Sequence, residues 1–352
     1  MAGRPNRSWR GAAIGWIAAA ALSAGALSQG ARGAAVEEFY RGRTVNVLIG
    51  YSVAGGYDAY GRVLARHMGR HIPGNPAVVP QNMPGAGSLR AANFLYNAAP
   101  KDGTVFGSFS RGMAMEPLLG NDAARFDATK FIWIGSIANE VSVCTSWHTS
   151  PVKTWDDALT KELTVSGEGS GSDPDIFATV LKNVFGARIR LVSGYPGTNE
   201  MSLAMERGEI DGRCGWSLSS IKIQKPAWLA EKKLNLLLQL NVQKSADLPD
   251  VPFVMDYATT DRQRQILRLV FSRQVMGRPF VAPPGIPDDR AMALRQAFDA
   301  TMSDPEFLAD AGRQGLEVKP ERGETLARLV DELYRTPPDV VAAARDVVHG
   351  AR

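Results

Sequence analysis

Three glycine-rich stretches have the residue types that could bind a small anion. They lie at 54–56, 85–87 and 167–171, and Asp58 follows the first of them. Glycine has no Cβ, so the backbone can turn sharply there and approach a ligand closely. Where such a loop opens a helix, free N–H groups and the helix dipole favour negative charge. The pattern therefore predicts anion-binding loops, with ordinary strand-to-helix turns as the alternative.

Each of these loops lies between an expected strand and an expected helix. The apolar run 45–49 is typical of a buried strand, and runs at 77–80 and 104–109 give a βαβαβ rhythm. This rhythm predicts an α/β fold with a parallel sheet, whose loops converge at the carboxyl ends of the strands. Further strands are expected at 131–137, 141–147, 163–166, 189–192, 210–216, 234–240 and 275–282, and helices at 154–163, 175–185 and 200–207.

The first 35 residues have the layout of a secretory signal peptide. Arg4, Arg7 and Arg10 precede an uncharged, alanine-rich run at 11–27, and small residues gather at 31–35. Segment 1–35 contains four of the 40 basic residues and none of the 36 acidic ones, so its removal leaves 36 of each. The exported chain is then near neutral, which argues against a nucleic-acid partner. Its length suggests two domains.

Several short motifs occur in a fixed order along the chain. They are Ala54-Gly55-Gly56-x-Asp58, Asn82-x-Pro84-Gly85-Ala86-Gly87, Ala99-Pro100-x-Asp102-Gly103, Gly208-x-Ile210-Asp211, the run from Ala246 to Pro252, and Ala282-Pro283-x-Gly285-x-Pro287. Together, from about residue 40 to 320, they resemble the substrate-binding proteins of tripartite tricarboxylate transporters, also called Bug-type receptors.

The resemblance implies a type II periplasmic-binding-protein fold, in which two α/β domains surround a cleft and the chain crosses between them twice. We expect residues 36–140 and 250–352 in the first domain and 141–249 in the second. The expected activity is capture of a small organic acid in the periplasm and delivery to membrane permease subunits, by a monomer without cofactor or catalysis. An exported oxidoreductase or hydrolase acting on a small acid is the alternative.

The expected ligand-binding residues lie in the loops and strand ends that face this cleft. They are Tyr51, Val53, Ala54, Gly55, Gly56, Tyr57, Asp58, Ser110, Arg111, Gly169, Ser170, Gly171, Ser172, Asp173, Tyr195, Gly197, Thr198 and Trp216.

Three of these assignments have alternatives. Backbone N–H groups of 54–57 could bind one carboxylate, and Arg111 could clamp a second one or be a surface arginine. Asp58 could cap its own helix, or face the cleft and attract an ammonium group. The aromatic residues near the loops could line a pocket or pack in the core.

The chain departs from the family pattern at several of these positions. Arg111 replaces a small residue, Asp173 falls where a histidine is often seen, 194–197 lacks a lysine, and the strand around Arg213 lacks an acidic end. The resemblance therefore leaves the ligand open among carboxylates and amino acids.

Other residues could form bonds outside the cleft. Cys144 and Cys214, the two cysteines, could form a disulfide in an exported protein or remain buried thiols. His67 and His71 are four residues apart on one expected helix, but no zinc signature accompanies them, which favours a structural role over a metal site. Arginines 62, 66 and 70 form a stripe that is either solvated or a docking surface.

Overall fold

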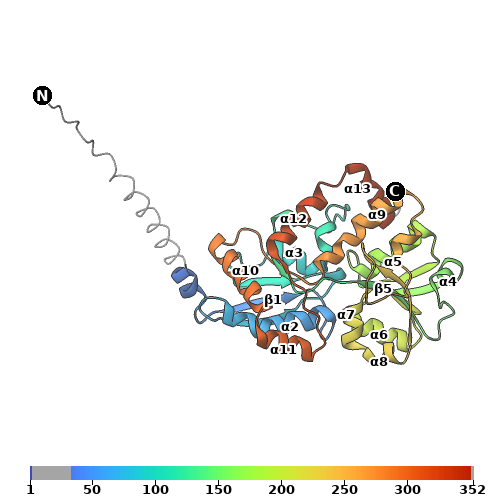
Figure 1. Cartoon of the computed structure of the whole chain (residues 1–352), viewed down its shortest axis with the longest axis horizontal. Coiled ribbons are helices and arrows are strands. Elements are labelled where there is room, and N and C mark those ends of the chain that lie inside the picture. Colours follow the sequence, from blue (N-terminus) through green and yellow to red (C-terminus); the bar gives the residue numbers. More distant parts are fainter. Residues whose placement is uncertain (2–32, 350–352) are drawn as a thin grey trace.

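Two β-sheets organise the chain in the computed structural model, which describes residue 1 and residues 33–349. The six-stranded sheet and the helices around it form the first lobe, and the five-stranded sheet and its helices form the second (Figure 1). The first sheet has the order β11-β4-β10-β3-β1-β2. Its strands are β1 (Thr44–Ile49), β2 (Ala77–Asn82), β3 (Val105–Ser108), β4 (Ile132–Ser136), β10 (Pro279–Ala282) and β11 (Glu321–Arg322).

The second sheet has the order β7-β6-β8-β5-β9. Its strands are β5 (Ser142–Trp147), β6 (Leu163–Ser166), β7 (Ile189–Val192), β8 (Gly212–Ser217) and β9 (Leu234–Leu240). The chain leaves the first sheet after β4 and returns to it at β10, so it crosses between the lobes twice. The topology confirms the expected two-lobed fold with two crossovers.

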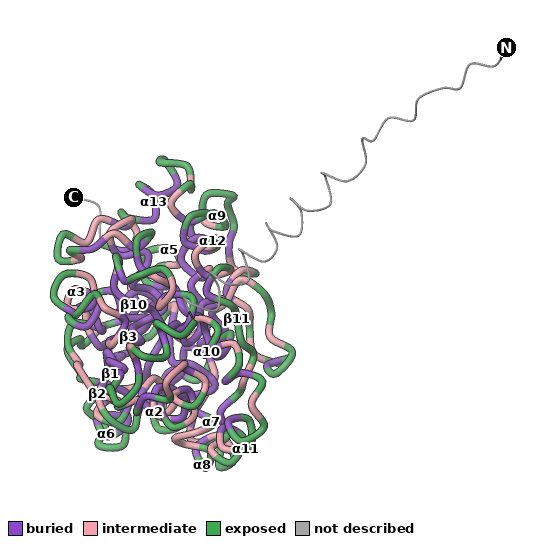
Figure 2. Tube along the Cα trace, turned by 90° about the vertical axis from the view of Figure 1, so that its left-hand side faces the viewer, coloured by how far each residue is buried: buried purple, intermediate pink, exposed green. Residues whose placement is uncertain are grey.

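The strand β1 shows why both faces of the first sheet are apolar. Val45 and Val47 are fully buried and share one hydrophobic cluster with α2 (Gly56–Met68) and α10 (Asp288–Met302). Leu48 points to the opposite face, in the cluster that contains α3 (Leu89–Asn97). Because helices cover both faces of the sheet, the sequence of this strand is almost continuously apolar. Figure 2 shows the buried residues gathered in the interior, around central strands such as β3 and β10.

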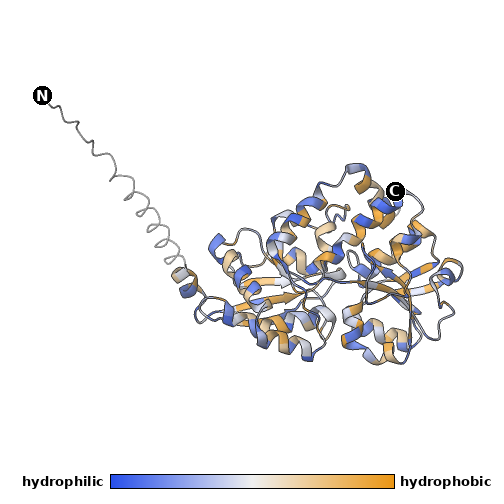
Figure 3. Cartoon of the chain, in the orientation of Figure 1, coloured by the Kyte–Doolittle hydropathy of each residue, from blue (hydrophilic) through white to orange (hydrophobic). Residues whose placement is uncertain are grey.

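The remaining helices cover the outside of the two lobes. In Figure 3 they alternate between hydrophilic and hydrophobic residues, as amphipathic helices packed on a core do. They are α4 (Trp155–Thr160), α5 (Asp173–Phe185), α6 (Thr198–Glu206), α7 (Leu218–Gln224), α8 (Pro226–Ala230), α9 (Asp261–Phe271), α11 (Pro305–Arg313), α12 (Gly323–Tyr334) and α13 (Pro338–His349).

The C-terminal helix ties the two lobes together. Helix α13 follows α12 in sequence but packs against α5 of the second lobe and against α9. The side-chain amide of Asn183 on α5 donates to the carbonyl of Val347, 2.6 Å away. The C-terminal segment therefore contacts both lobes.

Two expected elements differ from the observed ones. The strand expected at 275–282 is confined to β10, because Ser272–Met276 forms a 3-10 helix and the chain turns at Gly277, which has φ +36°. A Cβ at Gly277 would collide with the carbonyl of Ala138, so the turn brings this segment against the first crossover. The helix expected at 154–163 ends at Thr160, because Leu163 already begins β6.

A disulfide joins the two cysteines in the second lobe. Cys144 of β5 lies opposite Cys214 of β8, and the two strands pair antiparallel. Both side chains are fully buried within the lobe's hydrophobic core. The bridge closes a loop of 70 residues between strands that are already hydrogen-bonded neighbours.

The two histidines on the α2 side bind carboxylates of the C-terminal part. His67 Nε2 lies 2.9 Å from Asp310, and His71 Nε2 lies 2.7 Å from Asp304. Arg66 also bonds Asp310 and Arg70 bonds Asp304, so these two arginines of the stripe connect the α2 side to α11. Arg62 instead pairs with Asp58 of its own helix. Within residues 33–349, no cluster of three or more metal-ligating side chains occurs.

The expected signal peptide, 1–35, falls almost entirely outside the described residues. Residues 33–40 are helical and lead into β1. Among the described helices, none is long and apolar enough to cross a membrane.

Candidate functional site

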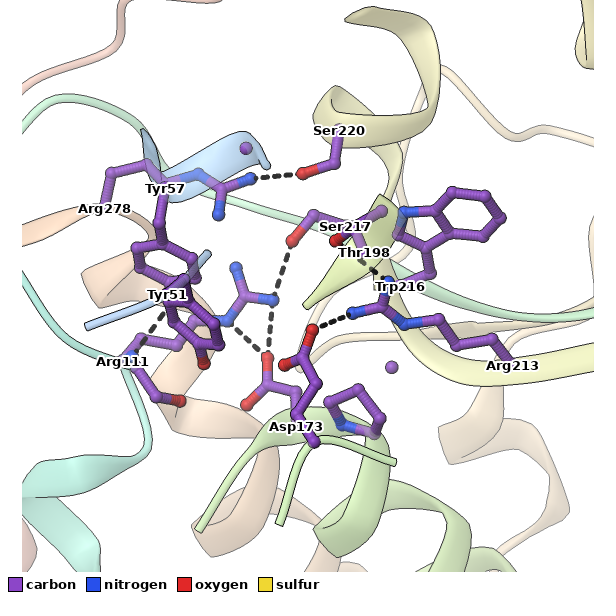
Figure 4. A pocket seen from close by; sticks show the side chains of 15 residues that line it. Tyr51, Tyr57, Arg111, Asp173, Thr198, Arg213, Trp216, Ser217, Ser220 and Arg278 are labelled. Carbon is purple, nitrogen blue, oxygen red and sulfur yellow. Dashed lines mark hydrogen bonds and ion pairs between the residues drawn. The ribbon is translucent and has the colours of Figure 1, made fainter. Parts of the chain in front are cut away.

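A small cavity lies where the two lobes meet (Figure 4). Its volume is about 30 Å³, room for about two water molecules by the usual requirement of a buried water. The first lobe contributes residues that follow β1 and β3, and the second contributes the start of α5, the end of β8 and α7. The lining residues are Tyr51, Gly56, Tyr57, Ser110, Arg111, Glu168, Asp173, Pro174, Thr198, Arg213, Gly215, Trp216, Ser217, Ser220 and Arg278.

The cavity brings together eight of the residues expected from the sequence. These are Tyr51, Gly56, Tyr57, Ser110, Arg111, Asp173, Thr198 and Trp216. The other expected residues lie outside its lining. They are Val53, Ala54, Gly55, Asp58, Gly169, Ser170, Gly171, Ser172, Tyr195 and Gly197.

Contacts beside the cavity connect the two lobes, and some of them involve residues outside the lining. The N–H of Gly87 donates to the carbonyl of Glu168, 2.9 Å away, so the second and third glycine loops touch. A Cβ on Gly87 would meet the carbonyl of Gly169 at 2.8 Å, which leaves room for glycine alone. The side chain of Gln224 on α7 donates to the carbonyl of Ala54, 2.6 Å away. The lobes are therefore closed on each other.

Asp58 holds the first glycine loop in shape. Its carboxylate accepts from the N–H of Ala54 at 2.8 Å and pairs with Arg62 at 2.8 Å. Ala54 has φ +60°, a left-handed conformation that this bond helps to hold. The carboxylate also accepts from the side chain of Asn82, so Asp58 is buried behind the loop, which it stabilises, and does not line the cavity.

Arg111 spans the interface between the lobes. It follows β3 in the first lobe and is 2% exposed. Its guanidinium donates to Asp173 at 2.5 Å, to Ser142 at 2.9 Å and to Ser217 at 3.0 Å, all in the second lobe. Burial alone would lower the pKa of Arg111, but the Asp173 carboxylate raises it above its ordinary value. Arg111 therefore stays charged in the interior.

Arg278, at the start of β10, is the second buried arginine of the site. Its guanidinium pairs with Glu140 at 2.8 Å and donates to Ser219 and Ser220 of α7, each at 2.9 Å. It also lies 4.6 Å from the centre of the Tyr57 ring, within cation–π range.

Arg213 of β8 is the third buried arginine of the site. It donates to Glu168 at 2.9 Å and to Thr198 at 3.0 Å, both in the second lobe. Burial raises the pKa of Glu168 to about 7, although Arg213 acts in the opposite direction. Burial also lowers the pKa of Arg213. The Glu168 carboxyl therefore titrates near neutral pH.

Among the described residues that line the site, buried donors without a partner outnumber buried acceptors without one, of which Asp173 Oδ1 is an example. Within residues 33–349, Arg111 Nη1, Arg213 Nε, Arg278 Nε and the indole nitrogen of Trp216 are buried without an acceptor. Figure 4 shows these side chains arranged around the same small space. Buried polar groups are normally bonded, so unpaired donors of this kind favour an anion with several oxygen atoms.

A family model for the tripartite tricarboxylate transporter family receptor matches residues 61–342, most of the chain. The chain belongs to this family. None of the curated proteins matches it in sequence.

Solved structures of similar receptors share the fold. The periplasmic binding protein BugD is 18% identical, with a TM-score of 0.69 over 86% of this chain and 96% of BugD. MatC from Rhodopseudomonas palustris, solved with bound malate, is 19% identical, with a TM-score of 0.66 over 85% and 99% of the two chains. Another R. palustris protein, solved with adipate, is 18% identical, with a TM-score of 0.67 over 86% and 97%.

Sequence reasoning missed seven residues that line the cavity in this receptor. They are Glu168, Pro174, Arg213, Gly215, Ser217, Ser220 and Arg278. The sequence around Arg213 could have indicated its role, because a charged residue within an apolar strand needs a buried partner. The sequence around Arg278 gave no such indication, because its partner Glu140 lies far away in the sequence.

Proposed function

We propose that this receptor works in the periplasm, closes its two lobes on a small organic acid with more than one carboxylate, and delivers it to membrane permease subunits. The observation that carries this proposal is the convergence of Arg111, Arg213 and Arg278 on one cavity between the lobes. The family membership and the ligands bound in similar structures, malate and adipate, support the ligand class.

The energetics of such a site are sufficient. Each charge-assisted hydrogen bond contributes about 1.5–3 kcal/mol. Two or three of them, with contacts to Tyr51, Tyr57 and Trp216, reach roughly −8 kcal/mol, which is micromolar affinity. The cavity of about 30 Å³ is too small for a dicarboxylate, so the ligand enters when the lobes are apart. The contacts of closure then include four residues outside the lining, Val53, Ala54, Gly169 and Gly197.

We place the lobe boundaries at residues 36–140, 141–249 and 250–352, and expect the exported chain to act as a monomer. A rigid-body hinge at the two crossovers would carry the closure. The neighbouring Arg111 and Asp173, one from each lobe, make the closed form dependent on charge.

The test is a binding screen on the chain from residue 36 onward. Isothermal titration with mono-, di- and tricarboxylates and their neutral amides should show micromolar binding of a di- or tricarboxylate. NMR of the bound acid after incubation should show it unchanged, which distinguishes a receptor from the alternative oxidoreductase or hydrolase. Binding of the amides alone, or conversion of the acid, would contradict the proposal.

A further inference from the structure

The strongest ionic contact across the site is made by two of the receptor's own side chains. Arg111 of the first lobe donates through Nε to one oxygen of Asp173, the first residue of α5 in the second lobe, and Nη2 lies in ion-pair contact with the same oxygen. Both side chains are buried, at 2% and 6% exposure. A carboxylate of the chain itself is thus bound to the guanidinium that is best placed to bind a carboxylate ligand.

The Asp173 carboxylate satisfies this arginine incompletely. Arg111 Nη1 is buried without an acceptor, although a bidentate carboxylate would use two nitrogen atoms on separate oxygens. The other oxygen of Asp173 also has no hydrogen bond within residues 33–349. Its nearest cation, Arg273 Nη1, lies 3.6 Å away. The ion pair is therefore formed, but each partner keeps one buried atom without a hydrogen bond.

Asp173 would remain stabilised if it left Arg111. It lies in the first turn of α5, where the helix dipole favours a carboxylate, and Arg273 lies on its other side. A free carboxylate could take its place on Arg111 while Asp173 turns to Arg273. Moving this side chain would also enlarge a cavity that is too small for a dicarboxylate as it stands.

From these contacts, and resting on the function proposed above, we infer that Asp173 is a built-in competitor that latches the empty receptor shut by binding Arg111. A ligand competes with this latch by binding Arg111 through its own carboxylate while the lobes are apart. A neutral analogue cannot do so, because it would leave a buried charge without a partner. Competition from Asp173 thus favours anionic ligands over neutral ones. It also reduces their apparent affinity to the intrinsic affinity multiplied by the fraction of receptor that is open.

The decisive variant is Asp173→Asn, which keeps the shape of the side chain and removes its charge. Small-angle scattering without ligand should show a larger radius of gyration than the wild type. Affinity for malate, used as the dicarboxylate probe, should increase at least about fivefold, the factor that corresponds to ~1 kcal/mol of competition. Asp156→Asn is the matched control, because Asp156 is an exposed acid in the first turn of α4. This control should change neither quantity.

Arg111→Gln breaks the same pair from the first lobe. It should also expand the empty receptor, but it should weaken malate binding because it removes the ligand's own partner. A thermal unfolding transition shows that each variant is folded, and if Asp173→Asn is not, the scattering of Arg111→Gln decides. An unchanged radius in the folded variants would overturn the latch. The scattering result needs no ligand, so expansion of both variants with no binding of any acid would uphold the latch and refute the proposed function.

Discussion

Gly56 is the position where one added methyl group tests the closure of the lobes. It begins α2 in the first lobe, and a Cβ there would meet Ser220 of α7 in the second lobe. That added Cβ would lie 3.3 Å from Ser220 Cβ and 3.1 Å from Arg278 Nη2, and closer still to Ser220 Oγ. Carbon atoms pack best at about 3.5–4.0 Å. Gly56→Ala is therefore a wedge between the lobes.

The size of the effect follows from what relieves the clash. Rotating Ser220 Oγ away would break its hydrogen bond to Arg278, which is 2.9 Å long, and would still leave the two Cβ atoms too close. Overpacking of this kind costs about 1–3 kcal/mol. Because the clash belongs to the closed empty form, the ratio of closed to open empty receptor should fall by roughly 5- to 150-fold. Asp173→Asn should also expand the empty receptor, but it differs from Gly56→Ala because it frees the ligand's partner and so raises malate affinity.

Small-angle scattering of the empty receptor measures this effect as a larger radius of gyration, and Gly55→Ala is the matched control. A Cβ on Gly55 would meet nothing closer than 3.7 Å, and its φ of −81° suits any residue. A thermal unfolding transition shows that each variant is folded, so a larger radius in Gly56→Ala would not arise from unfolding. Equal radii in both variants would refute the closed arrangement.

Three further predictions concern other groups. Arg111→Ala should weaken malate far more than the neutral diamide, and equal loss for both would contradict its role as a carboxylate clamp. Because the pKa of Glu168 is raised from 4.5 to about 7, its contribution to stability is fully present below pH 4.5 and is lost as the pH rises through 7. The free energy of unfolding, measured with urea, should therefore fall more over this pH range in the wild type than in Glu168→Gln. Parallel pH dependences of the two proteins would refute the raised pKa. Reduction of the Cys144–Cys214 bridge, which closes a 70-residue loop, should cost about 4 kcal/mol of stability, whereas two freely alkylated thiols in oxidised protein would disprove the bridge.

The fold followed from patterns that are local in the sequence. The strand expected at 234–240 is β9, and the capping pattern at Thr154 is present with Asp157 as its partner. Glycine loops between strands and helices predicted where the lobes meet, because parallel strands end at one edge of a sheet. The loops at 85–87 and 167–171 do touch there.

The charges of the site could be predicted only in part. Arg111 and Asp173 were expected near the cleft, but their pairing depends on how the two lobes dock. The pairs Arg278–Glu140 and Arg213–Glu168 join residues that are distant in the chain. No periodicity records which buried charges will meet, because that is decided by tertiary packing. The same holds for Gly277, whose turn is set by the crossover beside it.

The most direct test of a receptor for small acids is native mass spectrometry of the protein purified from its own periplasm. We predict a 1:1 complex that releases an organic acid with at least two carboxylates, and its loss from Arg111→Ala. A released metabolite without a carboxylate, or an added malate that leaves chemically altered, would contradict the account.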